Sequence, residues 1–257
     1  MLELNKIYCG DCLELMQKMG DSSVDLVLTS PPYNTSRAGG YDVYNKRYTT
    51  YSDSIPNEDY ILWTLKIFDL YDKILKPNGC VLYNLSYSGE NADLIWLLIS
   101  RIITETKFTT ADCIIWKKNT AIPNNRSKNK LTRIVEFIFV FVRKEEFKTF
   151  NTNKQVKSII KKTGQKNYEN IYNFIEAKNN DGSNCLNKAT FSTDLVEKLL
   201  DIYAAPDSVV YDSFMGAGTT AYACINKKLN YIGSELCKTQ CEYIESQIKS
   251  KSQSRLF

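Results

Sequence analysis

A short apolar run that stops at two consecutive prolines constrains this chain more than any other stretch. Residues 24–29 (Val-Asp-Leu-Val-Leu-Thr) have the length and composition of one buried β-strand. Pro31 and Pro32 cannot donate backbone hydrogen bonds, and each disfavours helix in the residue before it, so the strand must end at Ser30. The sequence therefore predicts a rigid extended turn at the carboxyl end of a strand, where open α/β sheets bind ligands.

The side chains of this turn suit a flat ring that carries an exocyclic amino group. Ser30 and the backbone carbonyl of Pro31 could accept the amino hydrogens, and Tyr33 could cover the ring. The alternative interpretation is a connection that is stiffened by its prolines and has no chemistry.

The composition excludes several classes of chemistry. The chain has no histidine, which removes histidine general bases, His-containing triads and zinc sites that need imidazole. Its 8 cysteines occur without secretory features, so we expect reduced thiols, a cytoplasmic location and no metal site. Cys9 and Cys12, together with Cys237 and Cys241, leave structural zinc as the alternative. No apolar run has the length of a membrane span.

Strand and helix patterns alternate along most of the chain, which predicts an α/β fold with a parallel sheet covered on both faces. The expected strands are 6–9, 24–29, 80–85, 110–116, 134–142, 208–212 and 230–234. The expected helices are 11–19, 57–75, 90–104, 193–203, a segment from 220 to 228, and 239–250.

A basic segment divides this alternating pattern. From residue 117 to residue 170 the sequence has 14 Lys and Arg against 4 Glu, a net charge of +10, whereas the whole chain is +4. Such a local excess of positive charge is typical of a surface that binds a polyanion. We therefore predict that residues 117–184 contact nucleic acid. A solvated charged face is the alternative. The β-rich run 134–142 inside this segment is expected to return to the main sheet.

A polar loop after the double proline extends the expected nucleic-acid contact. Residues 35–54 interleave tyrosines with cations, as a loop needs in order to stack on bases and touch phosphates. A mobile surface loop is the alternative. The candidate DNA-binding residues are Arg37, Arg47, Lys117, Lys118, Arg126, Lys128, Lys130 and Arg133.

A second candidate site lies at residues 212–220 (Asp-Ser-Phe-Met-Gly-Ala-Gly-Thr-Thr), between a strand and a helix. Gly216 and Gly218 would let backbone N–H groups approach a ligand closely. Glu235 follows at the end of the next strand, where an acidic side chain reaches both hydroxyls of a ribose. With two glycines and no phosphate-binding lysine, the turn fits a nucleoside without phosphates, of which S-adenosylmethionine is the common one. Asp212 could take its ammonium group.

These stretches together resemble the amino-methylating DNA methyltransferases. Residues 29–33 (Thr-Ser-Pro-Pro-Tyr) resemble the catalytic (D/N/S)-P-P-(Y/F) motif of that family. Residues 212–220, followed by Glu235, resemble its F-x-G-x-G cofactor motif. Residues 116–143 resemble its W-x-K-x-N…P…R…(Y/F)-E-(Y/F) stretch. The catalytic motif comes first and the cofactor motif last, as in the circularly permuted β group of the family.

The resemblance implies a Rossmann-like, S-adenosyl-L-methionine-dependent methyltransferase fold, circularly permuted, with an inserted basic region. Residues 1–116 would be the catalytic half, 117–184 the target-recognition region and 185–257 the cofactor-binding half. The implied reaction moves a methyl group to the exocyclic amino nitrogen of a flipped-out base in double-stranded DNA. The resemblance leaves open whether the protein acts with a cognate restriction endonuclease. It also leaves open whether the protein is a monomer or a homodimer.

The resemblance also assigns residues. The catalytic residues would be Ser30, Pro31, Pro32 and Tyr33. The cofactor-binding residues would be Asp11, Thr29, Thr190, Phe191, Asp212, Phe214, Gly216, Gly218, Thr219 and Glu235. Asp11 has a helix N-cap as its alternative role. Residues 189–191 (Ala-Thr-Phe) stand where the family more usually has a His-Pro or Lys-Pro pair.

The residue before the double proline bears on the target base. Serine at this position resembles the cytosine-N4 enzymes more than the adenine-N6 enzymes, in which aspartate is commoner. We therefore favour cytosine N4, with adenine N6 as the alternative. Two other classes stay open: an RNA or protein amino-methyltransferase, and an inactive module that only binds DNA.

Overall fold

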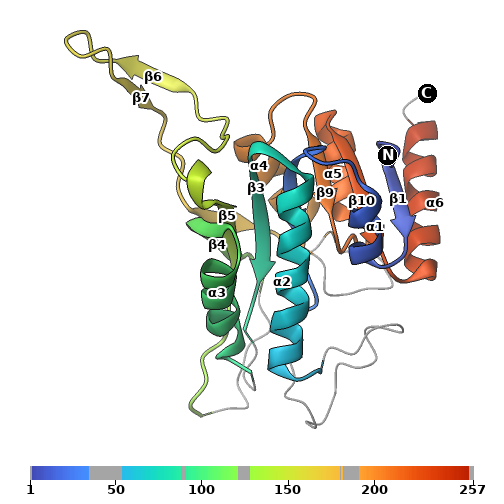
Figure 1. Cartoon of the computed structure of the whole chain (residues 1–257). Helices are drawn as coiled ribbons and strands as arrows, with labels where there is room; N and C mark the ends of the chain where they lie inside the picture. Colours follow the sequence, from blue (N-terminus) through green and yellow to red (C-terminus); the bar gives the residue numbers. More distant parts are fainter. Residues whose placement is uncertain are drawn as a thin grey trace.

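A computed structural model describes residues 2–34, 54–87, 91–120, 128–179, 181 and 191–254. They form a main sheet with helices on both faces and a separate two-stranded hairpin (Figure 1). The strands are β1 (Lys6–Cys9), β2 (Val24–Thr29), β3 (Leu75–Leu85), β4 (Phe108–Lys118), β5 (Val135–Arg143), β6 (Val156–Ile159), β7 (Lys166–Tyr168), β8 (Phe174–Ala177), β9 (Val209–Asp212) and β10 (Asn230–Glu235). The α-helices are α1 (Cys12–Lys18), α2 (Asn57–Ile74), α3 (Leu94–Glu105), α4 (Thr193–Tyr203), α5 (Thr219–Lys227) and α6 (Lys238–Ser254).

The main sheet has the strand order β1-β10-β9-β2-β3-β5-β4-β8. Its strands pair in parallel except for β5, which is antiparallel to both β3 and β4. The sequence pattern predicts parallel strands only, so β5 is a difference from that expectation. Parallel neighbours need a crossover, usually a helix, and no helix lies between β4 and β5 in the described part of the chain.

Helices cover the sheet in two layers, each over its own apolar core. Side chains of α1, α2 and α3 pack on one face, and side chains of α4, α5 and α6 pack on the other. In α2 the buried positions recur every three or four residues, as expected of an amphipathic helix. Phe68 of α2 lies at the centre of the first core, with its ring centroid 5.0 Å from that of Phe141 in β5. No helix in the described ranges is long and apolar enough to cross a membrane.

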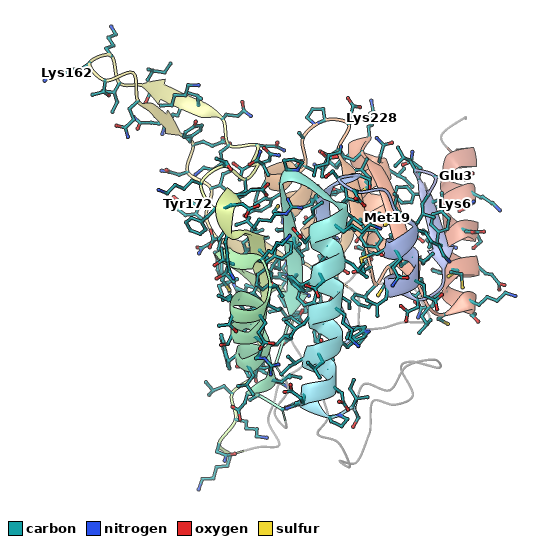
Figure 2. All side chains as sticks on the ribbon, viewed as in Figure 1. Glu3, Lys6, Met19, Lys162, Tyr172 and Lys228 are labelled. Carbon is teal, nitrogen blue, oxygen red and sulfur yellow. The ribbon has the colours of Figure 1, made fainter. Side chains whose placement is uncertain are left out.

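The direction of β5 divides the basic segment between the two ends of the sheet. β5 begins beside the end of β3, with Phe137 opposite Leu85, so the segment that precedes β5 lies at the rim where β2 and β3 end. Lys128 and Lys130 belong to this segment and are exposed. Residues 144–173 follow β5 at the opposite end, and there the hairpin of β6 and β7 projects from the body (Figure 1). Figure 2 shows Lys162 at the tip of this hairpin. The sequence pattern does not predict the hairpin or β8. The strands of the hairpin are exposed at every position, and β8 is a strand of 4 residues of which only Ile175 and Ala177 are buried.

Candidate active site

The two turns singled out in the sequence lie side by side in the structure. Their strands, β2 and β9, are parallel neighbours, with Val27 opposite Tyr211. Directly beyond this pairing, Thr29 Oγ1 donates a hydrogen bond of 2.6 Å to Asp212 Oδ1, although 183 positions separate the two residues. The double-proline turn and the two-glycine turn therefore leave the same rim of the sheet next to each other.

Asp212 joins these turns as a buried hydrogen-bond acceptor. Its side chain is only 1 % exposed, and it also accepts from Thr220 Oγ1 at 2.5 Å and from the Phe214 backbone N–H at 3.0 Å. Burial raises the pKa of the Asp212 carboxyl group, while the bonds from Thr220, Thr29 and Phe214 act in the opposite direction. Asp212 therefore holds the two turns together, and its expected contact with an ammonium group stays a prediction.

Glu235 closes the two-glycine turn from the end of β10. Its Oε2 accepts a 2.8 Å hydrogen bond from the Gly216 N–H, and its Oε1 accepts one of 2.8 Å from the Cys237 N–H. Burial raises the pKa of the Glu235 carboxyl group, and the two backbone donors lower it. Each carboxylate oxygen can accept a further hydrogen bond. A pair of adjacent hydroxyl groups, as on a ribose, matches these two remaining acceptor positions.

The turn itself depends on glycine. Gly216 and Gly218 both have left-handed φ angles, +56° and +87°. A Cβ atom on Gly218 would lie 2.6 Å from Cγ2 of Ile244, a fully buried side chain of α6. The backbone at residue 218 therefore approaches α6 more closely than any side chain would allow.

We expect Gly218→Ala to lower the free energy of unfolding by about 2–4 kcal/mol, since strain at positive φ adds to overpacking against Ile244. Gly164→Ala is the matched control, because Gly164 also has a positive φ of +70° but a Cβ there would meet nothing within 4 Å. That variant should lose only about 1 kcal/mol. Urea unfolding of both variants measures the difference, and equal losses would show that contact with α6 is unimportant.

The other predicted cofactor residues differ in their burial and in the elements to which they belong. Asp11 is the N-cap of α1, where its Oδ1 accepts a 2.7 Å bond from the Leu13 N–H. Thr219, 6 % exposed, begins α5. Phe191, 9 % exposed, packs in the core formed with α4. Thr190 lies outside the described residues. The N-cap interpretation of Asp11 is thus correct, and its contact with a cofactor stays a prediction.

An aromatic pair flanks the two-glycine turn. The Phe214 ring lies 5.5 Å from the ring of Trp63, centroid to centroid, and Trp63 in turn lies 5.7 Å from Tyr60. Both Tyr60 and Trp63 come from α2. The sequence analysis does not identify Trp63 as a site residue. Its spacing of three positions from Tyr60 places the two rings on one helix face, and that spacing is the signal that could have found it.

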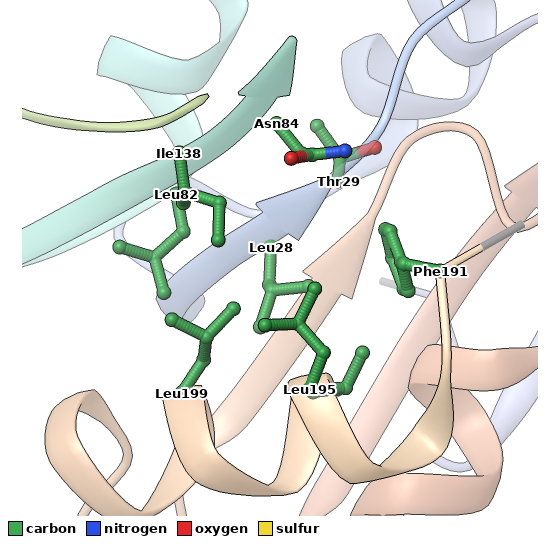
Figure 3. A pocket seen from close by; sticks show the side chains of 9 residues that line it. Leu28, Thr29, Leu82, Asn84, Ile138, Phe191, Leu195 and Leu199 are labelled. Atoms are coloured by element: carbon green, nitrogen blue, oxygen red, sulfur yellow. The ribbon is translucent and has the colours of Figure 1, made fainter. Parts of the chain in front are cut away.

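A cavity of about 10 Å³ lies beneath the site, between the sheet and α4 (Figure 3). Thr29 and Asn84 line it from the strands, and Phe191 and Leu195 line it from the other side. This volume is close to the space of a single water molecule. The cavity is too small for a nucleoside and belongs to the core.

The double-proline turn carries a group of polar side chains. Ser30 Oγ lies 2.9 Å from the Tyr33 hydroxyl, which donates a 3.0 Å hydrogen bond to Glu136 Oε2. Asn84 Nδ2 donates to the Tyr33 hydroxyl at 2.6 Å and to Glu136 Oε2 at 2.9 Å. Lys118 Nζ forms an ion pair with Glu136 Oε1. We call these five residues the Tyr33 cluster.

Two members of the Tyr33 cluster were not predicted as site residues. Asn84 is a polar position in residues 80–85, the mainly apolar second half of β3, and Glu136 is the acidic position in the mainly apolar β5. A buried polar residue in such a strand is the signal that could have found them. A further contact fixes the turn, because the Tyr60 hydroxyl donates a 2.6 Å bond to the Pro32 carbonyl.

The predicted DNA-binding residues that the structure describes lie along the rim. Lys118 pairs with Glu136, and Lys117 pairs with Glu176 at 2.5 Å. Arg133 donates from Nη1 to the Tyr87 carbonyl, with its guanidinium 5.4 Å from the centroid of the Tyr87 ring. Lys128 and Lys130 are exposed, while Arg37, Arg47 and Arg126 lie outside the described residues. Contact of these residues with DNA stays a prediction.

Comparisons with known proteins agree with this geometry. A family model described as DNA methylase, N6_N4_Mtase, matches residues 24–246. Type II methyltransferase M.BglII of Bacillus subtilis is 27 % identical over 260 residues, which cover 94 % of this chain and 67 % of the relative. M.Cfr9I of Citrobacter freundii is 26 % identical, over 91 % of this chain and 85 % of the relative.

Solved structures show the same fold. The PvuII DNA methyltransferase (cytosine-N4-specific) superposes with a TM-score of 0.71 at 19 % identity, over 93 % of this chain and 84 % of that one. The M1.HpyAVI–SAM complex gives a TM-score of 0.60 at 24 % identity, over 94 % of this chain and 98 % of that one. The Rossmann-like methyltransferase fold predicted from the sequence is therefore confirmed.

Proposed function

This chain belongs to the N6/N4 DNA methylase family, and from that premise we propose that it methylates an exocyclic amino nitrogen in a specific sequence of double-stranded DNA. The observation that carries the proposal is the Thr29–Asp212 hydrogen bond, which sets the double-proline turn beside the two-glycine turn. A methyl acceptor at the first turn and a methyl donor at the second would then be neighbours. Holding two reactants in such proximity supplies much of the acceleration of a transfer reaction.

The two-glycine turn fits S-adenosyl-L-methionine, the ligand named for the M1.HpyAVI complex. The two remaining acceptor positions of Glu235 suit ribose hydroxyls, and the turn that Glu235 closes depends on the left-handed φ angles of Gly216 and Gly218. Phe214, supported by Trp63, offers an aromatic surface. When bound, this cofactor supplies a methyl group activated by its sulfonium centre.

The double-proline turn would hold the target base. Ser30 Oγ and the Pro31 carbonyl would accept the two amino hydrogens, which favours a pyramidal nitrogen with an available lone pair. Flipping a base out of the duplex costs a few kcal/mol, and stacking on the Tyr33 ring returns about 1–3 kcal/mol. No strong base is needed, in keeping with a chain that has no histidine.

We propose cytosine N4 as the acceptor, with adenine N6 as the second candidate. The support is Ser30, which stands where adenine-specific relatives more often have aspartate. Incubation of DNA with methyl-labelled S-adenosyl-L-methionine, followed by nucleoside analysis, tests this directly. N4-methylcytosine is the expected product. N6-methyladenine as the sole product would overturn the choice of base, and label in RNA or protein but not in DNA would overturn the function.

The part of residues 117–184 at the rim is proposed to contact the target sequence, and the hairpin of β6 and β7 is not. The hairpin projects from the end of the sheet opposite the double-proline turn (Figure 2). The relatives are named Type II methyltransferases, and we propose that this chain likewise acts with a cognate endonuclease.

Loss of Lys128 and Lys130 should therefore weaken binding to a short duplex and reduce the slope of log affinity against log salt by about 2, one unit for each phosphate contact. The double variant Lys161→Ala/Lys162→Ala removes the same charge from the exposed hairpin and should leave affinity and slope unchanged. Fluorescence anisotropy at several salt concentrations measures both. A larger effect of the hairpin pair would place the DNA at the other end of the sheet.

A further inference from the structure

The buried carboxylate of the Tyr33 cluster fixes the direction of the hydrogen bonds around it. Glu136 is 8 % exposed, and its carboxylate can only accept. It accepts from the Tyr33 hydroxyl at 3.0 Å, from Asn84 Nδ2 at 2.9 Å and from the Lys118 ammonium group. Since a phenol has one hydroxyl proton, the proton of Tyr33 is directed to Glu136.

This direction determines what the Ser30 hydroxyl can do. Ser30 Oγ and the Tyr33 oxygen are 2.9 Å apart, and either could in principle donate to the other. Because Tyr33 already donates to Glu136, the proton between the two hydroxyls must come from Ser30. The Tyr33 oxygen then accepts from Ser30 and from Asn84 Nδ2. Ser30 Oγ is left with lone pairs only, so toward a ligand it acts as an acceptor.

The orientation of Asn84 supports the same order. Its Nδ2 faces Tyr33, Glu136 and, at 3.3 Å, Ser30. Its Oδ1 is buried and has no hydrogen-bond partner among the described residues. A buried unsatisfied oxygen is unfavourable, yet the opposite orientation would put an amide oxygen against the carboxylate of Glu136. The carboxylate therefore orients the amide as well as the phenol.

We propose that Glu136, acting through Tyr33, makes Ser30 an obligate acceptor for a hydrogen of the target amino group. The inference rests on the proposed function, because it concerns the base that Ser30 would bind. Glu136 is in this sense a positioning residue. An aspartate at position 30 would accept without help, whereas a serine hydroxyl can turn either way and must be oriented.

A double-mutant cycle tests this coupling. Tyr33→Phe and Glu136→Gln should each lower kcat about 10-fold when Ser30 is present, the effect of one hydrogen bond. In a Ser30→Ala background, where no hydroxyl remains to be oriented, neither substitution should lower kcat further. The Kd of S-adenosyl-L-methionine, measured by calorimetry, should not change. If Glu136→Gln does not fold, Tyr33→Phe makes the same comparison.

Two additional variants sharpen the test. In a Ser30→Asp background, activity should be insensitive to Glu136→Gln, since a carboxylate accepts whatever its neighbours do. Glu105→Gln removes an exposed carboxylate of α3 that pairs with Arg101 and should leave kcat unchanged. Equal fold-losses with and without the Ser30 hydroxyl would overturn the inference alone. A wild-type protein that does not methylate DNA amino groups would overturn the proposed function instead.

Discussion

Glu235→Gln is expected to weaken the binding of S-adenosyl-L-methionine by about 100-fold, or roughly 3 kcal/mol, because it alters two charge-assisted hydrogen bonds to the ribose. The loss has a second physical cause. The two carboxylate oxygens accept from the Gly216 and Cys237 N–H groups, so the NH₂ group of a glutamine must face one of these donors. Isothermal titration calorimetry measures the affinity. Glu242→Gln, which removes an exposed carboxylate of α6 near Lys238, should bind normally.

The same carboxylate predicts how cofactor affinity depends on pH. Burial raises the pKa of Glu235 from its usual value of 4.5, so on acidification this group takes up a proton at a higher pH than an exposed glutamate does. The ionised form accepts the ribose hydrogen bonds, and affinity should therefore fall as the pH is lowered through this raised pKa. Glu235→Gln should lack this dependence. An affinity that is unchanged in the variant would show that Glu235 serves the turn and not the ligand.

The parts of the site that follow from local pattern could be predicted from the sequence. The helix expected over 57–75 is α2, because its apolar spacing and the Pro77-Asn78-Gly79 stop are both local signals. The proximity of Thr29 and Asp212 could also be predicted from the sequence. Both residues end apolar runs of strand length, and the carboxyl ends of parallel strands share one rim.

The parts that depend on long-range strand pairing could not be predicted. Asn84 and Glu136 contact each other because β3 and β5 are antiparallel with Asn84 opposite Ile138, which puts both side chains on one face. Nothing local in either strand specifies that register. Because β5 is antiparallel to its neighbours, parts of the basic segment lie at opposite ends of the sheet. The net charge along the chain does not reveal this division.

Tyr33→Ala is expected to lower methyl transfer by about 10²- to 10³-fold, through the loss of base stacking worth about 1–3 kcal/mol and of one hydrogen bond worth about 1 kcal/mol. The truncation also removes the phenol that bonds to Asn84 and Glu136, so two buried polar groups lose a partner. Cofactor affinity should stay near the wild-type value, because Glu235 and the two-glycine turn are not altered. Single-turnover transfer of labelled methyl groups measures the rate.

Tyr33→Phe separates the two contributions, since it keeps the ring and removes only the hydroxyl. It should lose about 10-fold, so the further loss in Tyr33→Ala reports the ring alone. Tyr172→Ala, at a side chain that is 76 % exposed near the base of the hairpin, should transfer normally. Equal rates for Tyr33→Phe and Tyr33→Ala would mean that the ring does not stack on the base. The double-proline turn would then act only through Ser30 and the Pro31 carbonyl, and the flipped base would need its support from another aromatic side chain of the rim.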